Sequence, residues 1–235
     1  MLFRSAELPL DEYRIAGVLH PNIWHGHGPW QVRSWLRACE RSGLILLPPR
    51  EGWRAALIAS DLVIGDHGSV TFYGAALDRP LLLGAFPHDA VAPDSPVAEL
   101  GRTADRLDTR VPLRPQIDQA IADHVPGRHR AVTSKVTSDP GRSAALLRSE
   151  LYRLMNLPEP DAPPVVARVP EPGNLADPTV TATLVTASWE NGTVRVARIG
   201  AAAGLGHRRA PQGAHLAVDE REAEERLIEL GDVVL

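Results

Sequence analysis

The segment spanning residues 65–70 has the residue types of an anion-binding turn. An apolar run at residues 62–64 ends in Gly-Asp-His-Gly-Ser, and a helical pattern follows. An apolar run without alternation is typical of a strand covered on both faces. The first N–H groups of a helix have no partner within it, and the helix dipole is positive at that end. The turn is therefore suited to a phosphate group.

The residues of this turn have a chemical use and a structural alternative. We expect four of them to contact a phosphate-bearing ligand: His67, Gly68, Ser69 and Val70. Gly68 lets a ligand approach the backbone closely. Asp66 is a candidate catalytic residue that would orient His67 or hold a sugar hydroxyl. The alternative is that Asp66 and Ser69 only cap the helix, as such residues commonly do.

Three histidines supply further candidate groups. His20 follows the first expected strand and is a candidate acid, base or phosphate contact, because an unperturbed imidazole titrates at about pH 6.5. A single loop hydrogen bond is the alternative for His20. His25 and His27 would share one face of a strand, but no nearby carboxylate or cysteine completes a zinc site. We therefore expect no metal.

Composition limits the classes of function. The chain has 235 residues and a formal net charge of −4, without the basic excess that attracts nucleic acid or an anionic membrane. No apolar run reaches the roughly 20 residues of a membrane span, and the N-terminus lacks a signal-peptide pattern. Cys39 is the only cysteine, so no intrachain disulfide is possible. We expect a cytoplasmic protein without membrane insertion and without a nucleic-acid partner.

Strand and helix patterns alternate in the first part of the chain. Apolar strands are expected at residues 14–20, 44–47, 62–65 and 80–86. Helices are expected to begin near Pro29, Glu51 and Ser69, and Trp30, Trp35 and Trp53 fall at core spacing within them. Alternation with short connections predicts an α/β domain whose parallel sheet has helices on its faces.

The strand pattern stops after residue 86. Helices are expected at residues 115–125 and 143–156, the second with an apolar stripe of Leu147, Leu151, Leu154 and Met155. The polar segment at residues 126–139 contains a basic cluster, Arg128 to Arg130, and is expected to be a mobile loop. Phosphate contact is one interpretation of this cluster, and simple solvation is the other.

The last part of the chain has the texture of a small β module. A proline-rich linker is expected at residues 158–178, because proline favours extended chain. Strands at residues 179–188 and 193–199 flank Asn191-Gly192, a strong hairpin signal. A third strand near residues 214–218 and a helix at 219–230 follow, with Ala223, Leu227 and Leu230 on the apolar face. The expected domains are residues 1–157 and 179–235.

Residues 62–86 resemble the donor-binding, C-terminal half of bacterial GT-B transferases. The likeness is closest to the CDP-glycerol glycerophosphotransferases of wall teichoic acid synthesis and to related nucleotide-sugar transferases. In that family a strand ends in Asp-Tyr-Ser-Ser-Val, and a small-polar-Lys/Arg-Pro turn follows the next helix. Here residues 66–70 read Asp-His-Gly-Ser-Val, and residues 77–80 read Leu-Asp-Arg-Pro. His20-Pro21 resembles the family's His-Pro pair.

The resemblance implies half of a GT-B fold, a Rossmann-like parallel sheet with flanking helices, followed by the small β-rich module. It implies a glycosyltransferase-like or glycerophosphotransferase-like role for His20 and Asp66, with a CDP- or UDP-linked sugar or alditol phosphate as substrate and no further cofactor. The other half would come from a second domain, a protein partner or a homo-oligomer.

Two alternatives stay open. The first is a catalytically inactive nucleotide-binding or scaffolding module. Gly68 and Tyr73 favour it, because the family has a serine and an acidic residue at those positions. The second is an epimerase-like isomerase of nucleotide sugars, which would also need both halves of the fold.

Overall fold

Four apolar runs form parallel strands at the expected positions. These are β1 (Ile15–Gly17), β2 (Leu44–Leu46), β3 (Val63–Gly65) and β4 (Leu81–Leu83). β1 pairs with β2 and β3 pairs with β4, both in parallel. The expectation of one sheet is wrong, because the backbone hydrogen bonds divide these strands between two sheets. On the far side of β4 the second sheet continues into β5 (Asp105–Arg106).

The computed structural model describes residues 7–170, 178–201, 212–221 and 223–235. Part of the expected linker, residues 171–177, lies outside this description. The chain is mixed α/β and falls into two units. Unit 1 comprises residues 1–56, 109–115 and 172–235, and unit 2 comprises residues 57–108 and 116–171. The domain boundaries expected at residues 157 and 178 stay a prediction.

A short helix occupies the segment after β1 that contains His25 and His27. α1 (Pro21–His27) begins at His20, whose Nδ1 accepts the N–H of Asn22 at 3.1 Å. Proline at the first helical position needs no intrahelical hydrogen bond, so Pro21 starts this helix rather than only ending the strand. α1 ends at Gly28, whose φ of 82° suits glycine.

The longer helix α2 (Pro29–Glu40) builds the core beside β1 and β2. It buries Val32, Leu36 and Cys39 against Trp24 and Leu44.

The expected core role of two tryptophans is wrong. Trp30 is 75% exposed and Trp35 is 50% exposed. Trp24 of α1 is the tryptophan buried in this core. The difference follows from α1, because a helix at residues 21–27 turns Trp24 toward β1 and β2.

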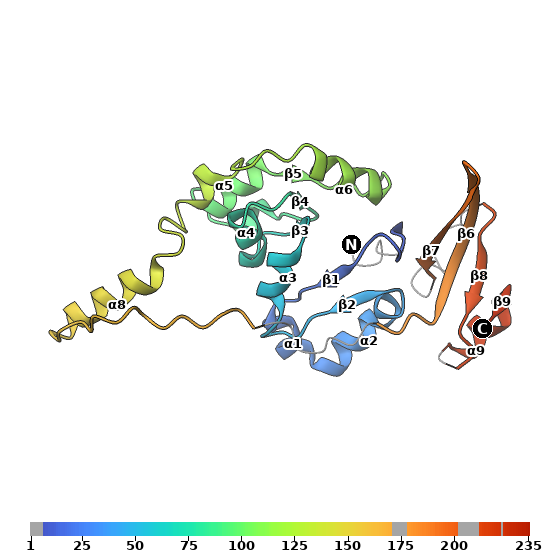
Figure 1. The fold of residues 1–235 in the computed structure, drawn as a ribbon, viewed down its shortest axis with the longest axis horizontal. Coiled ribbons are helices and arrows are strands. Elements are labelled where there is room, and N and C mark those ends of the chain that lie inside the picture. The colour runs from blue at the N-terminus through green and yellow to red at the C-terminus, as the bar shows by residue number, and fades with distance from the viewer. Residues whose placement is uncertain (1–6, 171–177, 202–211, 222) are drawn as a thin grey trace. The chain divides into compact units, whose positions relative to one another are not determined.

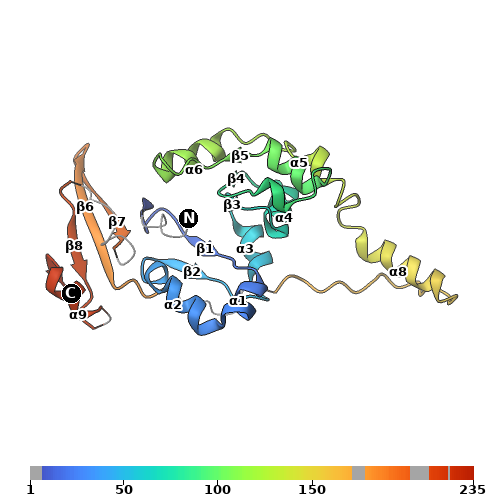
Figure 2. The same cartoon turned by 180° about the vertical axis from the view of Figure 1, so that it is seen from behind.

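The C-terminal strands confirm the expected hairpin and third strand. β6 (Ala182–Glu190) and β7 (Thr193–Gly200) are antiparallel, and β8 (His215–Val218) pairs with the other edge of β6. Asn191 and Gly192 have φ of 49° and 81°, as the turn requires. β9 (Val233–Val234), which was not expected, pairs with β8 in parallel. Figure 2 shows this sheet from behind.

The terminal helix α9 (Glu225–Leu230) packs on this sheet through Leu227. Ala223 and Ile228 pack against the same cluster. Leu230 is exposed, contrary to expectation. None of the helices in the described ranges is both long and apolar enough to cross a lipid bilayer.

Close contacts join the C-terminal strands to the N-terminal segment within unit 1. A Cβ added to Gly200 would lie 2.4 Å from the carbonyl oxygen of Ser42, so only glycine fits there. Asp11 accepts the side-chain Nε and the backbone N–H of Arg198, at 3.0 and 3.1 Å. Arg41 forms an ion pair with Glu224. The outer edge of β7 is thus capped by residues far away in sequence.

Unit 2 is built around the sheet of β3, β4 and β5. α4 (Ser69–Ala76) packs on β3 and β4, as Figure 1 shows. α5 (Pro96–Thr103) packs against α7 (Arg130–Thr133). The apolar core joins Phe72, Leu81, Leu83, Phe86 and Leu100, with Val132 of α7. The remaining helices are α3 (Trp53–Ala59), a 3-10 turn at His88–Ala90, α6 (Leu113–Ala122) and α8 (Ser143–Leu154).

The segment at residues 126–139, expected to be a mobile loop, is folded into the core of unit 2. It contains α7, in which Val132 and Thr133 are buried. Lys135 forms an ion pair with Glu99 of α5. The sequence pattern did not predict this helix, because α7 has only one turn and polar residues surround its two buried residues.

Two glycines in helices provide a matched test of packing in the two units. A Cβ on Gly101 of α5 would lie 2.3 Å from the ring of Phe86, whereas one on Gly26 of α1 would meet nothing within 4 Å. We expect Gly101→Ala to lower the free energy of unfolding by about 1–3 kcal/mol through overpacking. Gly26→Ala should raise it by up to about 1 kcal/mol through helix propensity. Urea denaturation followed by circular dichroism measures both free energies of unfolding. A Gly101→Ala variant as stable as the native protein would contradict the packing of Phe86 against Gly101.

Candidate functional site

The turn between β3 and α4 is closed by its own residues. Asp66 Oδ1 accepts the N–H of Gly68 at 2.7 Å, and the Asp66 N–H donates to Thr71 Oγ1 at 3.0 Å. A Cβ on Gly65 would lie 2.1 Å from Thr71 Oγ1, so glycine is required where the strand ends. The Asp66 carboxylate therefore closes the turn, but it does not cap α4, so the capping role considered as its alternative is not what the structure shows.

The first amides of α4 retain part of the expected anion site. Gly68 is the N-cap residue, and no side chain caps this helix among the described residues. Ser69 and Val70 begin the helix, and the side chain of Ser69 is not the cap. Among the backbone groups of these residues, the amide of Gly68 is occupied by Asp66. The binding roles of His67, Gly68, Ser69 and Val70 stay predictions, as does the catalytic role of Asp66.

A cluster of aromatic and basic side chains lies at the carboxyl ends of the strands, next to this turn. His67 meets the ring of Phe86 edge-on, with ring centroids 6.3 Å apart. His88 lies 5.1 Å from the same ring, and the Arg106 guanidinium lies 5.9 Å from it. Phe86 therefore gathers residues that follow β3, β4 and β5 around one buried ring. We call His67, Phe86, His88 and Arg106 the Phe86 cluster.

Hydrogen bonding defines the charge of the Phe86 cluster. One terminal guanidinium nitrogen of Arg106 lies 2.7 Å from Nε2 of His88. Because arginine only donates, Nε2 of His88 accepts and carries no proton in this arrangement. His67 Nδ1 is buried and has no hydrogen-bond partner among the described residues. The cluster thus offers one cation, one buried polar nitrogen and an aromatic surface.

Two members of this cluster were not identified from the sequence pattern. Arg106 belongs to a two-residue strand of exposed polar residues, which has no apolar pattern to detect. His88 follows β4 after Pro87, and only its position beyond a strand end marks it. The position of Arg106 depends on the pairing of β5 with β4, whereas His88 is placed by the turn that follows β4.

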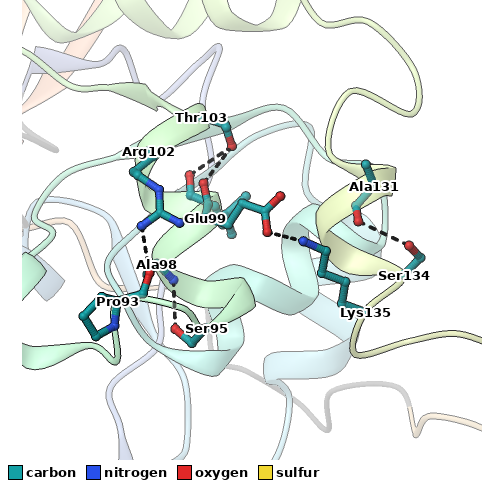
Figure 3. Close-up of polar contacts among 10 residues, drawn as sticks. Pro93, Ser95, Ala98, Glu99, Arg102, Thr103, Ala131, Ser134 and Lys135 are labelled. Carbon is teal, nitrogen blue, oxygen red and sulfur yellow. Dashed lines mark hydrogen bonds and ion pairs between the residues drawn. The ribbon is translucent and has the colours of Figure 1, made fainter.

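The helix α5 packs against Phe86, and Figure 3 shows polar contacts that hold this helix. Ser95 caps α5 by accepting the N–H of Ala98 at 3.1 Å. Arg102 donates to the carbonyl of Pro93 at 3.0 Å, and Glu99 pairs with Lys135. These contacts fix α5, and with it Gly101, whose missing side chain makes room for Phe86.

The residues of the expected family turn have structural partners. Asp78, with φ of 59°, accepts the N–H of Gly127 at 2.9 Å and lies 3.5 Å from His124. Arg79 donates to the carbonyl of Ile58 at 2.5 Å. The likeness at residues 77–80 therefore coincides with a helix C-terminus that is bonded to Gly127 and Ile58.

Two residues of the basic cluster at residues 128–130 have structural roles in the fold. Arg128 donates to both carboxylate oxygens of Asp105, at 2.5 and 3.0 Å. The hydrogen bond from Arg128 lowers the pKa of Asp105 below its usual value, and that of Arg128 is raised. His129 is buried, and burial followed by the nearby Arg128 charge lowers its pKa below 6.5. The pairing of Arg128 argues against its use as a phosphate contact.

The remaining histidine candidates belong to unit 1. His20 caps α1 through one hydrogen bond, which is the structural alternative considered for it, and its catalytic role stays a prediction. His25 and His27 lie on a helix, where residues two apart point in different directions, so the face they would share on a strand does not exist. The described residues contain no group of three or more His, Cys, Asp or Glu side chains placed to hold a metal ion.

Comparisons with known proteins give no relative to guide this assignment. No family model matches the sequence, and no curated protein or solved structure is significantly similar to it.

Burial of His129 predicts a pH dependence of stability. The folded pKa lies below 6.5, so the unfolded chain binds a proton that the folded chain does not bind as the pH falls below that value. The free energy of unfolding should therefore decrease as the pH falls from about 6.5 toward the folded pKa. His129→Gln should flatten this dependence. Urea denaturation between about pH 7.5 and about pH 5.5 measures it, and an equal slope in the variant would contradict the assignment.

Proposed function

We propose that unit 2 binds a phosphate-bearing small molecule at the carboxyl ends of β3, β4 and β5. The observation that carries the proposal is the position of Arg106, held over Phe86 beside the turn that opens α4. A guanidinium, the positive end of a helix and its unoccupied amides are the groups that recognise phosphate in proteins. Ligands bind at this edge of parallel α/β sheets in general.

The ligand that we favour is a nucleotide-activated sugar or alditol phosphate. The spacing of residues 66–70 and 77–80 supports this choice through its likeness to the donor half of GT-B transferases. The amides of Ser69 and Val70 and the Arg106 guanidinium would stabilise the leaving nucleotide without a metal. Transfer to an acceptor would need a second half, from another domain or a partner. Asp66 is the candidate catalytic residue of unit 2, and the catalytic role of His20 in unit 1 is a separate proposal.

A second candidate function is a nucleotide-binding or scaffolding module without catalysis. The specific observation in its favour is that the Asp66 carboxylate is bound to the Gly68 amide. A negative charge there opposes an incoming phosphate, and a carboxylate engaged in this turn is a poor orienter of substrate. In this case nucleotide would bind without turnover.

Calorimetric titration with CDP and UDP tests the binding site. Arg106→Gln should weaken binding by about tenfold or more, because a hydrogen bond to a charged group contributes about 1.5–3 kcal/mol. Arg142→Gln is the matched control, since it removes the same charge from an exposed position outside the Phe86 cluster. Equal losses in both variants would indicate only long-range attraction.

Neutralising the negative charge at the turn should change nucleotide affinity in the opposite direction, toward tighter binding. Asp66→Asn keeps an acceptor for the Gly68 amide but removes the negative charge, so nucleotide should bind about fivefold more tightly, a gain of about 1 kcal/mol.

Gly68→Val should block binding, because its Cβ would already lie 2.8 Å from Asp66 Oδ1 and would fill the approach to the backbone. Absence of binding by the native protein at millimolar nucleotide would reject the proposal.

A further inference from the structure

Arg106 and His88 form a hydrogen-bonded pair within the Phe86 cluster. Nη2 of Arg106 lies 2.7 Å from Nε2 of His88, and the same nitrogen donates to the carbonyl of Gly101 at 3.3 Å. Each terminal guanidinium nitrogen carries two hydrogens, so the protein itself uses both hydrogens of Nη2. The side chains of Arg106 and His88 are exposed, which makes the pair accessible to a ligand.

The hydrogen that Nη2 donates to His88 is the one that a phosphate group needs. A guanidinium binds phosphate most strongly through two parallel hydrogen bonds. Its end-on arrangement uses Nη1 and Nη2, and its side-on arrangement uses Nε and Nη2, so both require Nη2. Gly101 is buried, and the hydrogen directed at its carbonyl points into the protein. A phosphate that binds Arg106 through two hydrogen bonds therefore displaces His88.

Displacement leaves Nε2 of His88 without a donor and next to the negative charge of the ligand. A free imidazole nitrogen can bind a proton, and an unperturbed imidazole does so at about pH 6.5. The protonated ring then donates a charge-assisted hydrogen bond to the phosphate, because both of its nitrogens are donors. His88 thus changes from an acceptor for Arg106 into a second cationic donor for the ligand.

We propose that His88 takes up a proton when a phosphate-bearing ligand binds, so that this site binds its ligand more tightly as the pH falls. The inference rests on the proposed function of unit 2 and adds a regulation of the same site. The proton comes from solvent and bonds to Nε2, so no other reactant is needed. Without ligand, that proton would place two cations in contact, whereas bound phosphate supplies the compensating negative charge.

The other charged and titratable groups on the elements that meet Phe86 have partners or are solvated. These groups are Asp66, His67, Asp89, Glu99, Arg102 and Asp105. Glu99 and Asp105 form ion pairs with Lys135 and Arg128. Arg102 donates to Pro93, and Asp66 accepts the Gly68 amide. Asp89 is exposed, so solvent and salt screen its charge. Among these groups, His67 is the other imidazole that a test has to separate from His88.

Calorimetric titration of the full chain with CDP-glycerol and UDP-glucose tests the proposal. Both ligands contain only esterified phosphates, whose charge is constant near neutral pH, whereas a terminal phosphate titrates at about pH 6. Affinity should rise about fivefold or more from about pH 8 to about pH 6, because a proton bound only in the complex couples affinity to pH. Titration in two buffers of different ionisation enthalpy should show net proton uptake.

Two histidine variants assign the proton. His88→Gln should show no proton uptake and no rise in affinity at low pH, because glutamine keeps an acceptor for Arg106 and does not titrate. His88 is exposed, so this variant should fold. His25→Gln is the matched control: it removes an exposed imidazole of unit 1 and should keep the proton uptake of the native protein.

Failure of this inference and failure of the proposed function give different results. Binding of either ligand without proton uptake would overturn the inference and leave the proposed function intact. Proton uptake that persists in His88→Gln and is lost in His67→Gln would assign the proton to the other imidazole and would overturn it as well. Absence of binding of both ligands by the native protein at millimolar concentration would overturn the proposed function and the inference together.

Discussion

The candidate site depends on the packing of Phe86 against Gly101. A side chain at position 101 would overlap the phenyl ring, so the ring lies deep in the core only because α5 carries glycine there. From that seat the ring meets His67, His88 and Arg106 at its edge and faces. Core packing therefore positions residues from three strand ends, and the hydrogen bonds of Arg106 add to this packing. Arg106, a long and exposed side chain, is held in place by this ring together with His88 and the carbonyl of Gly101.

The turn at residues 65–69 shows how one sequence pattern serves two competing uses. Glycine, an acidic residue and a short polar residue before a helix are needed for an anion site, and they are also needed for a self-contained turn. Here Asp66 accepts the Gly68 amide and its own amide donates to Thr71, so the folded chain satisfies part of the turn internally. A phosphate would have to tolerate or displace a carboxylate, and the guanidinium of Arg106 is the group that offsets this repulsion.

Local signals predicted much of the fold and less of the site. The β3–turn–α4 unit and the Asn191-Gly192 hairpin follow from apolar runs and turn residues that act over a few positions. Features fixed by long-range pairing could not be predicted. β5 is a strand only because β4 presents a free edge to Asp105 and Arg106. α7 is folded because Val132 meets the core. Arg106 enters the site through the pairing of β5 with β4, and His88 enters it from the turn after β4. No residue spacing in the sequence predicted that these two side chains would meet.

The helices α2 and α8 show that hydrophobic periodicity identifies the apolar face of a helix but not the surface that covers it. Both have 12 residues and both carry apolar side chains at helical spacing. α2 buries Val32, Leu36 and Cys39 against Trp24 and Leu44, because α1 and β2 lie next to it in the chain and supply the matching surface. α8 is followed by a proline-rich segment that supplies only polar contacts to its back. An amphipathic pattern therefore identifies the face that must be covered, whereas the neighbouring sequence decides whether the same chain covers it. The described residues supply no cover for the apolar side chains of α8.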